Sequence, residues 1–407
     1  MLKRITASEL RLGMFIDRLD GSWLEHSFWR GRFLLEDPRD LERVRESGID
    51  ALWIDTSKGL DVAAPQAASA GAAPPDPAPA PQVRPTGQPK CSINDELARA
   101  ASIVRKAKPA VVSMFNEIRM GRAIDAEKAL PLVQEISDSV ARNHGALIGI
   151  ARLKDKDEYT YMHSVAVCAL MIALARQLNV DDSLIREIGL AGLLHDVGKA
   201  MIPPAVLNKP GKLTDAEFDL VKTHPERGRD ILVASATVGE IPIDVCLHHH
   251  ERVDGTGYPH RLKGEQITLY ARMGAICDVY DAVTSNRPYK NGWDPAESIQ
   301  KMAGWCKTHF DEAVFQAFVK AMGIYPVGSL VRMQSERLGI VVEQGSSSLL
   351  TPMVKVFFSL RSQMHIEPES VDLAAKNCSD RIVAREDPQR WNFPHLNELF
   401  LSGVTAH

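Results

Sequence analysis

A proline- and alanine-rich segment at residues 63–90 divides this chain of 407 residues. The segment contains eight prolines and nine alanines and has no apolar periodicity. Such a composition cannot bury a core, and its prolines favour an extended, semi-rigid spacer. The sequence therefore predicts a linker at residues 63–92, with a small domain at residues 1–62 before it and a larger region after it.

The N-terminal region has the pattern of a small mixed α/β domain. Apolar residues alternate at residues 11–19, 31–36 and 51–57, which is typical of strands. Residues 37–48 have the pattern of a short helix, with Pro38 near its start and Gly48 after its end. A unit of this size can fold, but its core is expected to be modest.

Residues 93–324 have a helical pattern throughout, because their apolar residues recur at spacings of three and four. A helix at residues 181–198 is expected to start at an Asp cap and to end at Gly198, and Thr214 with Glu217 has the spacing of a capping box. We expect an all-helical bundle here, with the core of its domain at about residues 150–324.

At residues 325–407 the helical pattern gives way to alternating apolar runs, which predict a β-rich extension. Two alternating runs rich in Val, Leu and Phe, at residues 328–344 and 352–362, are separated by a serine-rich turn and indicate a small β-hairpin. The predicted fold class is therefore mainly α, with a small α/β domain before the bundle and a small β appendage after it.

Composition and charge exclude several classes of protein. The 48 basic and 52 acidic residues leave a net charge of −4, which favours neither a nucleic-acid polymer nor an anionic membrane as partner. The longest fully apolar run, residues 165–175, is too short to span a membrane, and the first residues lack the apolar stretch of a signal peptide. We therefore expect a cytoplasmic protein. Its six scattered cysteines include no CxxC pair and indicate no disulfide framework.

Histidines and aspartates concentrate in the helical region, and each has an ordinary explanation when it is taken alone. A histidine in an apolar helix is often a core residue, a His-Asp dipeptide is common, and a run of three histidines can be a solvated surface. Two aspartates one helical turn apart can cap a helix or form ion pairs. The candidates are His163, His195, Asp196, His224, His248, His249, His250, Asp278 and Asp281.

Taken together, these residues point to a metal site. Burying so many ionisable groups is costly unless they pair with one another or bind a metal. Helical bundles build metal sites from such side chains on facing helices. A mixed set of imidazoles and carboxylates suits iron, manganese, nickel, cobalt or zinc, and a bridging carboxylate is a common way to hold two ions.

Four motifs then give the chain a family resemblance. They are HDVGK at residues 195–199, HPERGRDIL at 224–232, HHHERVDGTGYPHRLKGEQI at 248–267 and ARMGAICDVYDAVTSNRPYK at 271–290. In this order, from residue 163 to residue 290, the chain resembles the HD-GYP family, bacterial cyclic di-GMP phosphodiesterases within the HD phosphohydrolases. DGTGYP and SNRPYK make the resemblance specific, because they lie outside the general HD pattern. Residues 10–29 and 51–59 also resemble the small domain of unknown function that precedes many HD-GYP domains.

The resemblance implies a role for each matching position. Asp196 and Lys199 would be the catalytic residues. Asp196 would bridge two ions, and Lys199 would contact a substrate phosphate. His248 is an extra member of the triple histidine and receives no role. The nucleotide pocket would be shaped by Lys199, Tyr258, Asp281, Arg287 and Lys290. The metal ligands would be His163, His195, Asp196, His224, His249, His250 and Asp278.

One position departs from part of the family. Some members carry a glutamate one helical turn before the first ligand histidine and bind a third metal there. Here Tyr159 occupies that position, and its neighbour Glu158 lies about 100° further round the helix. Because a tyrosine is a poor ligand, we expect two divalent ions, iron or manganese first, with nickel, cobalt or zinc as alternatives.

The resemblance implies metal-dependent hydrolysis of cyclic di-GMP, in which a metal-bridging hydroxide attacks phosphorus. The product would be pGpG, and a second cut would give GMP. Two alternatives stay open: a catalytically weak cyclic di-GMP sensor or adaptor, and an HD phosphohydrolase that acts on another cyclic nucleotide. Cyclic di-GMP synthases of the GGDEF type, bound through the GYP loop, and a second copy of the chain are candidate partners.

Overall fold

The computed structural model describes residues 2–6, 9–19, 33–35, 41, 51–61, 91–152, 159–235, 237–285, 292–345, 348–391, 393, 396 and 399. The chain forms two compact units, Met1–Thr86 and Gly87–His407. The helix predicted at residues 37–48 and the linker predicted at residues 63–92 lie almost entirely outside the described residues. The predicted domain boundaries therefore stay predictions.

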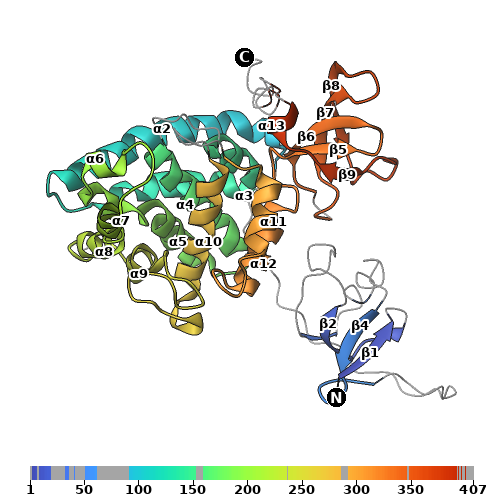
Figure 1. Cartoon of the computed structure of the whole chain (residues 1–407), viewed down its shortest axis with the longest axis horizontal. Coiled ribbons are helices and arrows are strands. Elements are labelled where there is room, and N and C mark those ends of the chain that lie inside the picture. Colours follow the sequence, from blue (N-terminus) through green and yellow to red (C-terminus); the bar gives the residue numbers. More distant parts are fainter. Residues whose placement is uncertain are drawn as a thin grey trace. The chain divides into compact units, whose positions relative to one another are not determined.

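The first unit contains a four-stranded antiparallel sheet with the strand order β1-β4-β2-β3 (Figure 1). Alternate residues of the last strand, Leu52 and Ile54, are fully buried, which is the period of two expected of a half-buried strand. The strands predicted within residues 11–19, 31–36 and 51–57 are present, and the first strand was not predicted. The strands are β1 (Leu2–Thr6), β2 (Phe15–Leu19), β3 (Phe33–Leu34) and β4 (Ala51–Asp55).

The second unit begins with the predicted helical bundle, and the prediction is confirmed. Its central helix, α4, is buried at every position from residue 162 to residue 175, as its uniformly apolar sequence requires. The α-helices are α2 (Ile93–Arg119), α3 (Leu130–Arg152), α4 (Tyr159–Gln177), α5 (Asp182–Leu194), α6 (Pro204–Leu207), α7 (Asp215–Val221), α8 (His224–Val233), α9 (Glu240–His248), α10 (Leu269–Thr284), α11 (Pro295–Ala303) and α12 (Glu312–Met322). Short 3-10 turns are η2 (Ala126–Lys128), η4 (Val197–Met201) and η5 (Gly264–Gln266).

Helix α4 packs against α3, α5 and α10, and α9 packs against α5, α8 and α10 (Figure 1). The predicted caps are present. The side chain of Asp181 accepts a hydrogen bond from the backbone of Ser183 before α5, and Thr214 forms a reciprocal capping box with Glu217 before α7. The packing contacts join α4, α5, α9 and α10, and α8 is added through its contact with α9.

One helix end differs from the prediction. Helix α5 ends at Leu194 rather than at Gly198, which lies inside the turn η4. A Cβ atom on Gly198 would stand 1.9 Å from the carbonyl oxygen of His224, so this position needs glycine for close contact with α8 rather than to end a helix. Helix α7 ends at Val221, and His224 is the first residue of α8.

The C-terminal extension is a five-stranded antiparallel sheet with the order β8-β7-β6-β5-β9, and not the predicted hairpin. A tight turn at residues 334–336, with Glu336 at a φ of +58°, splits the first predicted strand without a glycine or proline to mark it. The edge strand β8 is mostly exposed and contains Pro368, so it lacks the apolar alternation that reveals a strand. The elements are β5 (Leu330–Met333), β6 (Arg337–Glu343), β7 (Met353–Ser359), β8 (Met364–Asp372), β9 (Ile382–Arg385) and α13 (Pro388–Trp391).

Within the described ranges, no helix combines the length and the apolar character needed to cross a bilayer.

Candidate metal centre

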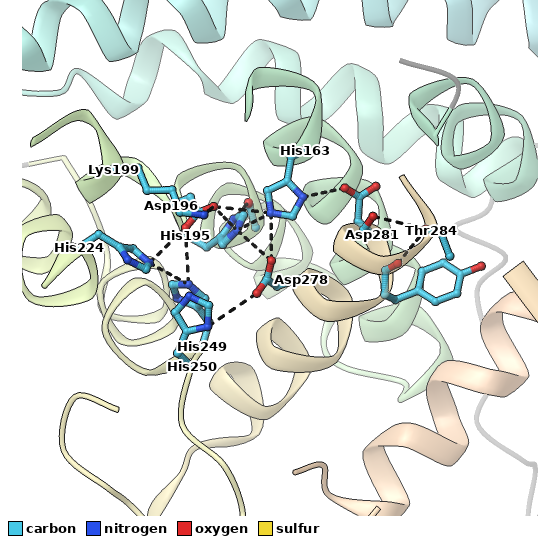
Figure 2. Close-up of polar contacts among 12 residues, drawn as sticks. His163, His195, Asp196, Lys199, His224, His249, His250, Asp278, Asp281 and Thr284 are labelled. Carbon is cyan, nitrogen blue, oxygen red and sulfur yellow. Dashed lines mark hydrogen bonds and ion pairs between the residues drawn. The ribbon is translucent and has the colours of Figure 1, made fainter. Parts of the chain in front are cut away.

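The seven predicted metal ligands converge inside the helical bundle, in two groups (Figure 2). In each group the candidate ligand atoms all lie within 4.8 Å of one another. All seven residues are buried except His250, which is partly exposed. The first group is Asp196, His224, His249 and His250, and the second group is His163, His195 and Asp278.

Helix ends deliver most of these side chains, which explains why ligands far apart in the sequence meet. His195 caps the end of α5, His224 opens α8 and His249 caps the end of α9. Only His163 on α4 and Asp278 on α10 lie within long helices, and these two helices pack side by side.

Asp196 lies between the two groups. Its Oδ1 is 3.3 Å from Nε2 of His224 and 3.7 Å from Nε2 of His249. Its Oδ2 is 3.3 Å from Nε2 of His195 and 3.6 Å from Nε2 of His163. Oδ1 is buried without a hydrogen-bond partner among the described residues, and such a group calls for an explanation in a folded protein. A metal ion is the explanation that fits, since the neighbouring imidazole nitrogens point at the same oxygen.

The histidines are oriented by bonds from their other ring nitrogen. Bonding of Nδ1 leaves Nε2 as the atom that faces Asp196, which is the usual arrangement behind a metal-binding histidine. The Nδ1 contacts are His195 to the carbonyl of Gly192 (2.8 Å), His224 to the carbonyl of Val221 (2.7 Å), His249 to the carbonyl of Val245 (3.0 Å) and His163 to the carboxylate of Asp281 (2.7 Å).

Asp281 stands behind His163 rather than among the seven converging groups (Figure 2). It is 3% exposed and lies one helical turn after Asp278 on α10. Its carboxylate fixes the proton of His163 on Nδ1 and thereby presents Nε2 to Asp278, 3.0 Å away. The predicted role of Asp281 in the nucleotide pocket stays a prediction; the position itself is that of a residue that orients a ligand.

Both carboxylates of the centre are held ionised. Burial alone would raise the pKa of Asp196, but the charges of Lys199 and His195 outweigh it and hold this pKa well below its usual range. Burial likewise opposes ionisation of Asp278, and the hydrogen bond and charge of His163 outweigh it, so that its pKa also falls well below the usual range. Two anionic ligands are therefore available to a cation.

Two imidazoles of the first group, those of His224 and His250, are held neutral. Burial lowers the pKa of His224, and burial together with the neighbouring His249 lowers that of His250 well below its usual range. His163 behaves differently: burial lowers its pKa, but its hydrogen bonds to Asp278 and Asp281 outweigh burial and raise the pKa overall. Since metals bind neutral imidazole and ionised carboxylate, most of the donor set is already in its binding form.

Two predicted substrate-binding residues lie at the edge of the centre. The ammonium group of Lys199 is 2.5 Å from Oδ2 of Asp196, and its side chain is 23% exposed. The ring of Tyr258 stacks on that of His250, with centroids 4.7 Å apart. Arg287 and Lys290 lie outside the described residues. So does the side chain of Tyr159, although α4 begins at this residue, and the prediction about a third metal is untested.

The loop that follows the triple histidine is ordered by Glu251, which sequence reasoning missed. Glu251 is 2% exposed, and its carboxylate accepts hydrogen bonds from the backbone N–H groups of His260 (2.7 Å) and Leu262 (3.0 Å). Gly255 has a φ of +81°, a conformation that favours glycine, whereas Gly257 is needed because a Cβ there would lie 2.4 Å from the backbone nitrogen of Arg252. The sequence did contain a signal for this role, since Glu251 is an acidic residue directly after the three histidines at residues 248–250.

Comparison with known proteins places this centre within a matched domain. Residues 146–314 match the family described as HD domain, and residues 2–129 match the family described as Domain of unknown function (DUF3391). The chain is 57% identical over 406 residues to cyclic di-GMP phosphodiesterase PA4108 of Pseudomonas aeruginosa, covering 98% of this chain and 96% of that protein.

Two further relatives match a shorter part of the chain. The cyclic di-GMP phosphodiesterase response regulator RpfG of Xanthomonas campestris is 37% identical over 177 residues, which is 42% of this chain and 46% of that protein. The 3'3'-cGAMP-specific phosphodiesterase 3 of Vibrio cholerae is 31% identical over 201 residues, which is 49% of this chain and 42% of that protein.

Proposed function

The chain belongs to the HD-GYP family of phosphodiesterases, and on this premise we propose that it hydrolyses cyclic di-GMP to pGpG. The observation that carries the proposal is the position of Asp196, whose two oxygens face two separate groups of ligand side chains. The extensive identity to a protein named for this substrate supports the choice of nucleotide. GMP would require a second cut.

We propose that the two groups hold two divalent ions, iron or manganese first, with Asp196 as the bridging ligand. His163, His195 and Asp278 would hold one ion, and the remaining histidines the other. When bound, two such cations lower the pKa of a coordinated water and neutralise charge on the phosphate oxygens. Nickel, cobalt and zinc suit the same donors.

The protein's own groups would bind and orient the substrate. Lys199 would exchange part of its contact with Asp196 for a phosphate oxygen, acting as a positive point charge at the exposed edge of the centre. Tyr258, stacked on His250, would form one wall of the nucleotide site. Arg287 and Lys290 as phosphate or base contacts, a cytoplasmic location, a GGDEF partner and a homodimer stay predictions.

A second candidate is hydrolysis of another cyclic dinucleotide. It is favoured by the relative named for 3'3'-cGAMP, which matches the part of the chain that carries the centre. The same two-ion chemistry applies to either substrate, because both contain phosphodiester bonds between nucleosides. Only a direct comparison of the two substrates separates the candidates.

The test is anaerobic purification with metal analysis, followed by an assay of cyclic di-GMP and 3'3'-cGAMP with iron, manganese, nickel or zinc. We expect about two ions per chain, preference for cyclic di-GMP and pGpG as the first product on chromatography. His195→Ala should lose turnover and retain cyclic di-GMP binding, whereas His365→Ala, at an exposed histidine of the C-terminal sheet, should behave as the unaltered protein. Binding without turnover under every metal would replace the proposal with the sensor function.

A further inference from the structure

His248 is the member of the triple histidine that belongs to neither metal group. It is the last residue of α9, and its Nδ1 lies 2.8 Å from Oδ1 of Asp244, one helical turn earlier. A carboxylate can only accept, so Nδ1 of His248 donates, and in the neutral imidazole the other ring nitrogen, Nε2, is an acceptor. The acceptor role of Nε2 determines the direction of the hydrogen bond that this nitrogen forms.

Nε2 of His248 lies 3.2 Å from Nδ1 of His260, which therefore donates to it. His260 belongs to the loop at residues 251–263, two residues after Tyr258. The centroids of the two imidazole rings are 5.4 Å apart, and Oε1 of Glu226 on α8 lies 3.9 Å from Nε2 of His260. The outer side of the loop is thus joined to α9 by a side-chain hydrogen bond.

The other end of this chain of bonds reaches α10. The second carboxylate oxygen of Asp244 accepts a hydrogen bond from the hydroxyl of Thr268. Thr268 is the N-cap of α10, and its oxygen accepts from the backbone of Ala271 (3.1 Å). Since α10 carries Asp278, the series Thr268–Asp244–His248–His260 connects a ligand-bearing helix, the end of α9 and the loop.

The loop contacts the triple histidine at two points, which lie two residues apart on each of the two segments. Tyr258 stacks on His250, and His260, two residues later, bonds to His248, two residues earlier. His249 lies between these two contacts, inside the first metal group. The outer members of the triple histidine therefore both contact the loop, and His250 does so while it belongs, with His249, to the first metal group.

We propose that the series Thr268–Asp244–His248–His260 is a positioning device that keeps Tyr258 stacked on His250 and so sets the affinity for the nucleotide. This inference rests on the proposed function, because it assigns Tyr258 to the wall of the same site. Neither His248 nor His260 is a metal ligand in it, and losing their bond is expected to leave metal binding intact.

The test compares His248→Ala, His260→Ala, the double variant and His260→Asn, because an asparagine amide can donate from the position of Nδ1. Glu265→Ala, at an exposed residue just after the loop, is the control. Measured for each are the metal content, KM and kcat with cyclic di-GMP, and backbone amide exchange at residues 251–263.

Each single alanine variant should raise KM roughly 3- to 10-fold, the effect of losing one hydrogen bond, with kcat and metal content nearly unchanged. The double variant should be no worse than His248→Ala alone, because each single variant already removes the bond between His248 and His260. His260→Asn should recover most of the loss, and amide exchange in the loop should be faster only in the alanine variants.

Three outcomes would overturn the inference. KM could stay unchanged in the alanine variants, or the increases in KM from the two alanine substitutions could multiply in the double variant. His260→Asn could also be as impaired as His260→Ala. A loss of metal that accounts for the lost activity would overturn it as well. If the unaltered protein does not turn over cyclic di-GMP, the proposed function fails, and amide exchange in the loop alone tests the positioning role. Equal exchange rates in all variants would overturn that role. Exchange that is faster in His260→Ala but restored in His260→Asn would support it.

Discussion

Replacing Asp281 with asparagine is expected to weaken metal binding at the group formed by His163, His195 and Asp278. The carboxylate of Asp281 bonds to Nδ1 of His163 at 2.7 Å, and both groups are almost fully buried. A hydrogen bond to a charged group contributes roughly 1.5–3 kcal/mol. Each 1.4 kcal/mol is about a factor of ten in affinity. We therefore expect metal affinity at this group to fall about 10- to 100-fold, as for other residues that orient metal ligands.

The assay is titration of the metal-free protein with Mn²⁺ or Zn²⁺ in competition with a chelating dye. One of two binding steps should weaken in Asp281→Asn, while the step that belongs to the other group stays the same. Asp230→Asn is the matched control, since Asp230 is exposed on α8 and pairs only with its neighbour Arg229 in the described structure. Unchanged metal affinity together with a raised KM for cyclic di-GMP would refute the reasoning and place Asp281 in the nucleotide pocket instead.

Three further outcomes are expected. Gly198→Ala would place a Cβ 1.9 Å from the carbonyl oxygen of His224, so it should cost about 1–3 kcal/mol of unfolding free energy and reduce bound metal, as measured by urea unfolding and metal analysis. Glu251→Gln should destabilise the loop by about 2 kcal/mol and speed amide exchange at His260 and Leu262, because their N–H groups donate to this carboxylate. Unaltered exchange at both residues would show that the carboxylate is unimportant. Burial raises the pKa of Asp294 from 3.8 to about 6, so the folded state binds the extra proton and this group lowers stability as the pH rises from 4 to 7, by roughly 3 kcal/mol at most. Asp294→Asn should remove that fall in urea unfolding, and an equally steep fall in the variant would contradict the assignment.

Much of the fold was predictable because it depends on local patterns. The continuous apolar run at residues 165–175 of α4 and the caps at Asp181 and Thr214 are local features of the chain, so the sequence predicts them directly. The C-terminal sheet was predicted only as a hairpin, because its turn at Glu336 has no marker and its edge strand β8 is mostly polar and exposed. Strand pairing between distant segments depends on tertiary packing, which no short window of sequence contains.

The identity of the candidate ligands was a property of the sequence, since histidines and aspartates in apolar helices are costly to bury without a partner. Tertiary structure alone decided how they are used. It turned the two oxygens of Asp196 toward different groups, placed Asp281 behind His163 and joined His248 to His260 in the loop. The physical reason is distance: charges, hydrogen bonds and close contacts such as that at Gly198 act over a few ångströms between side chains that are far apart in the chain.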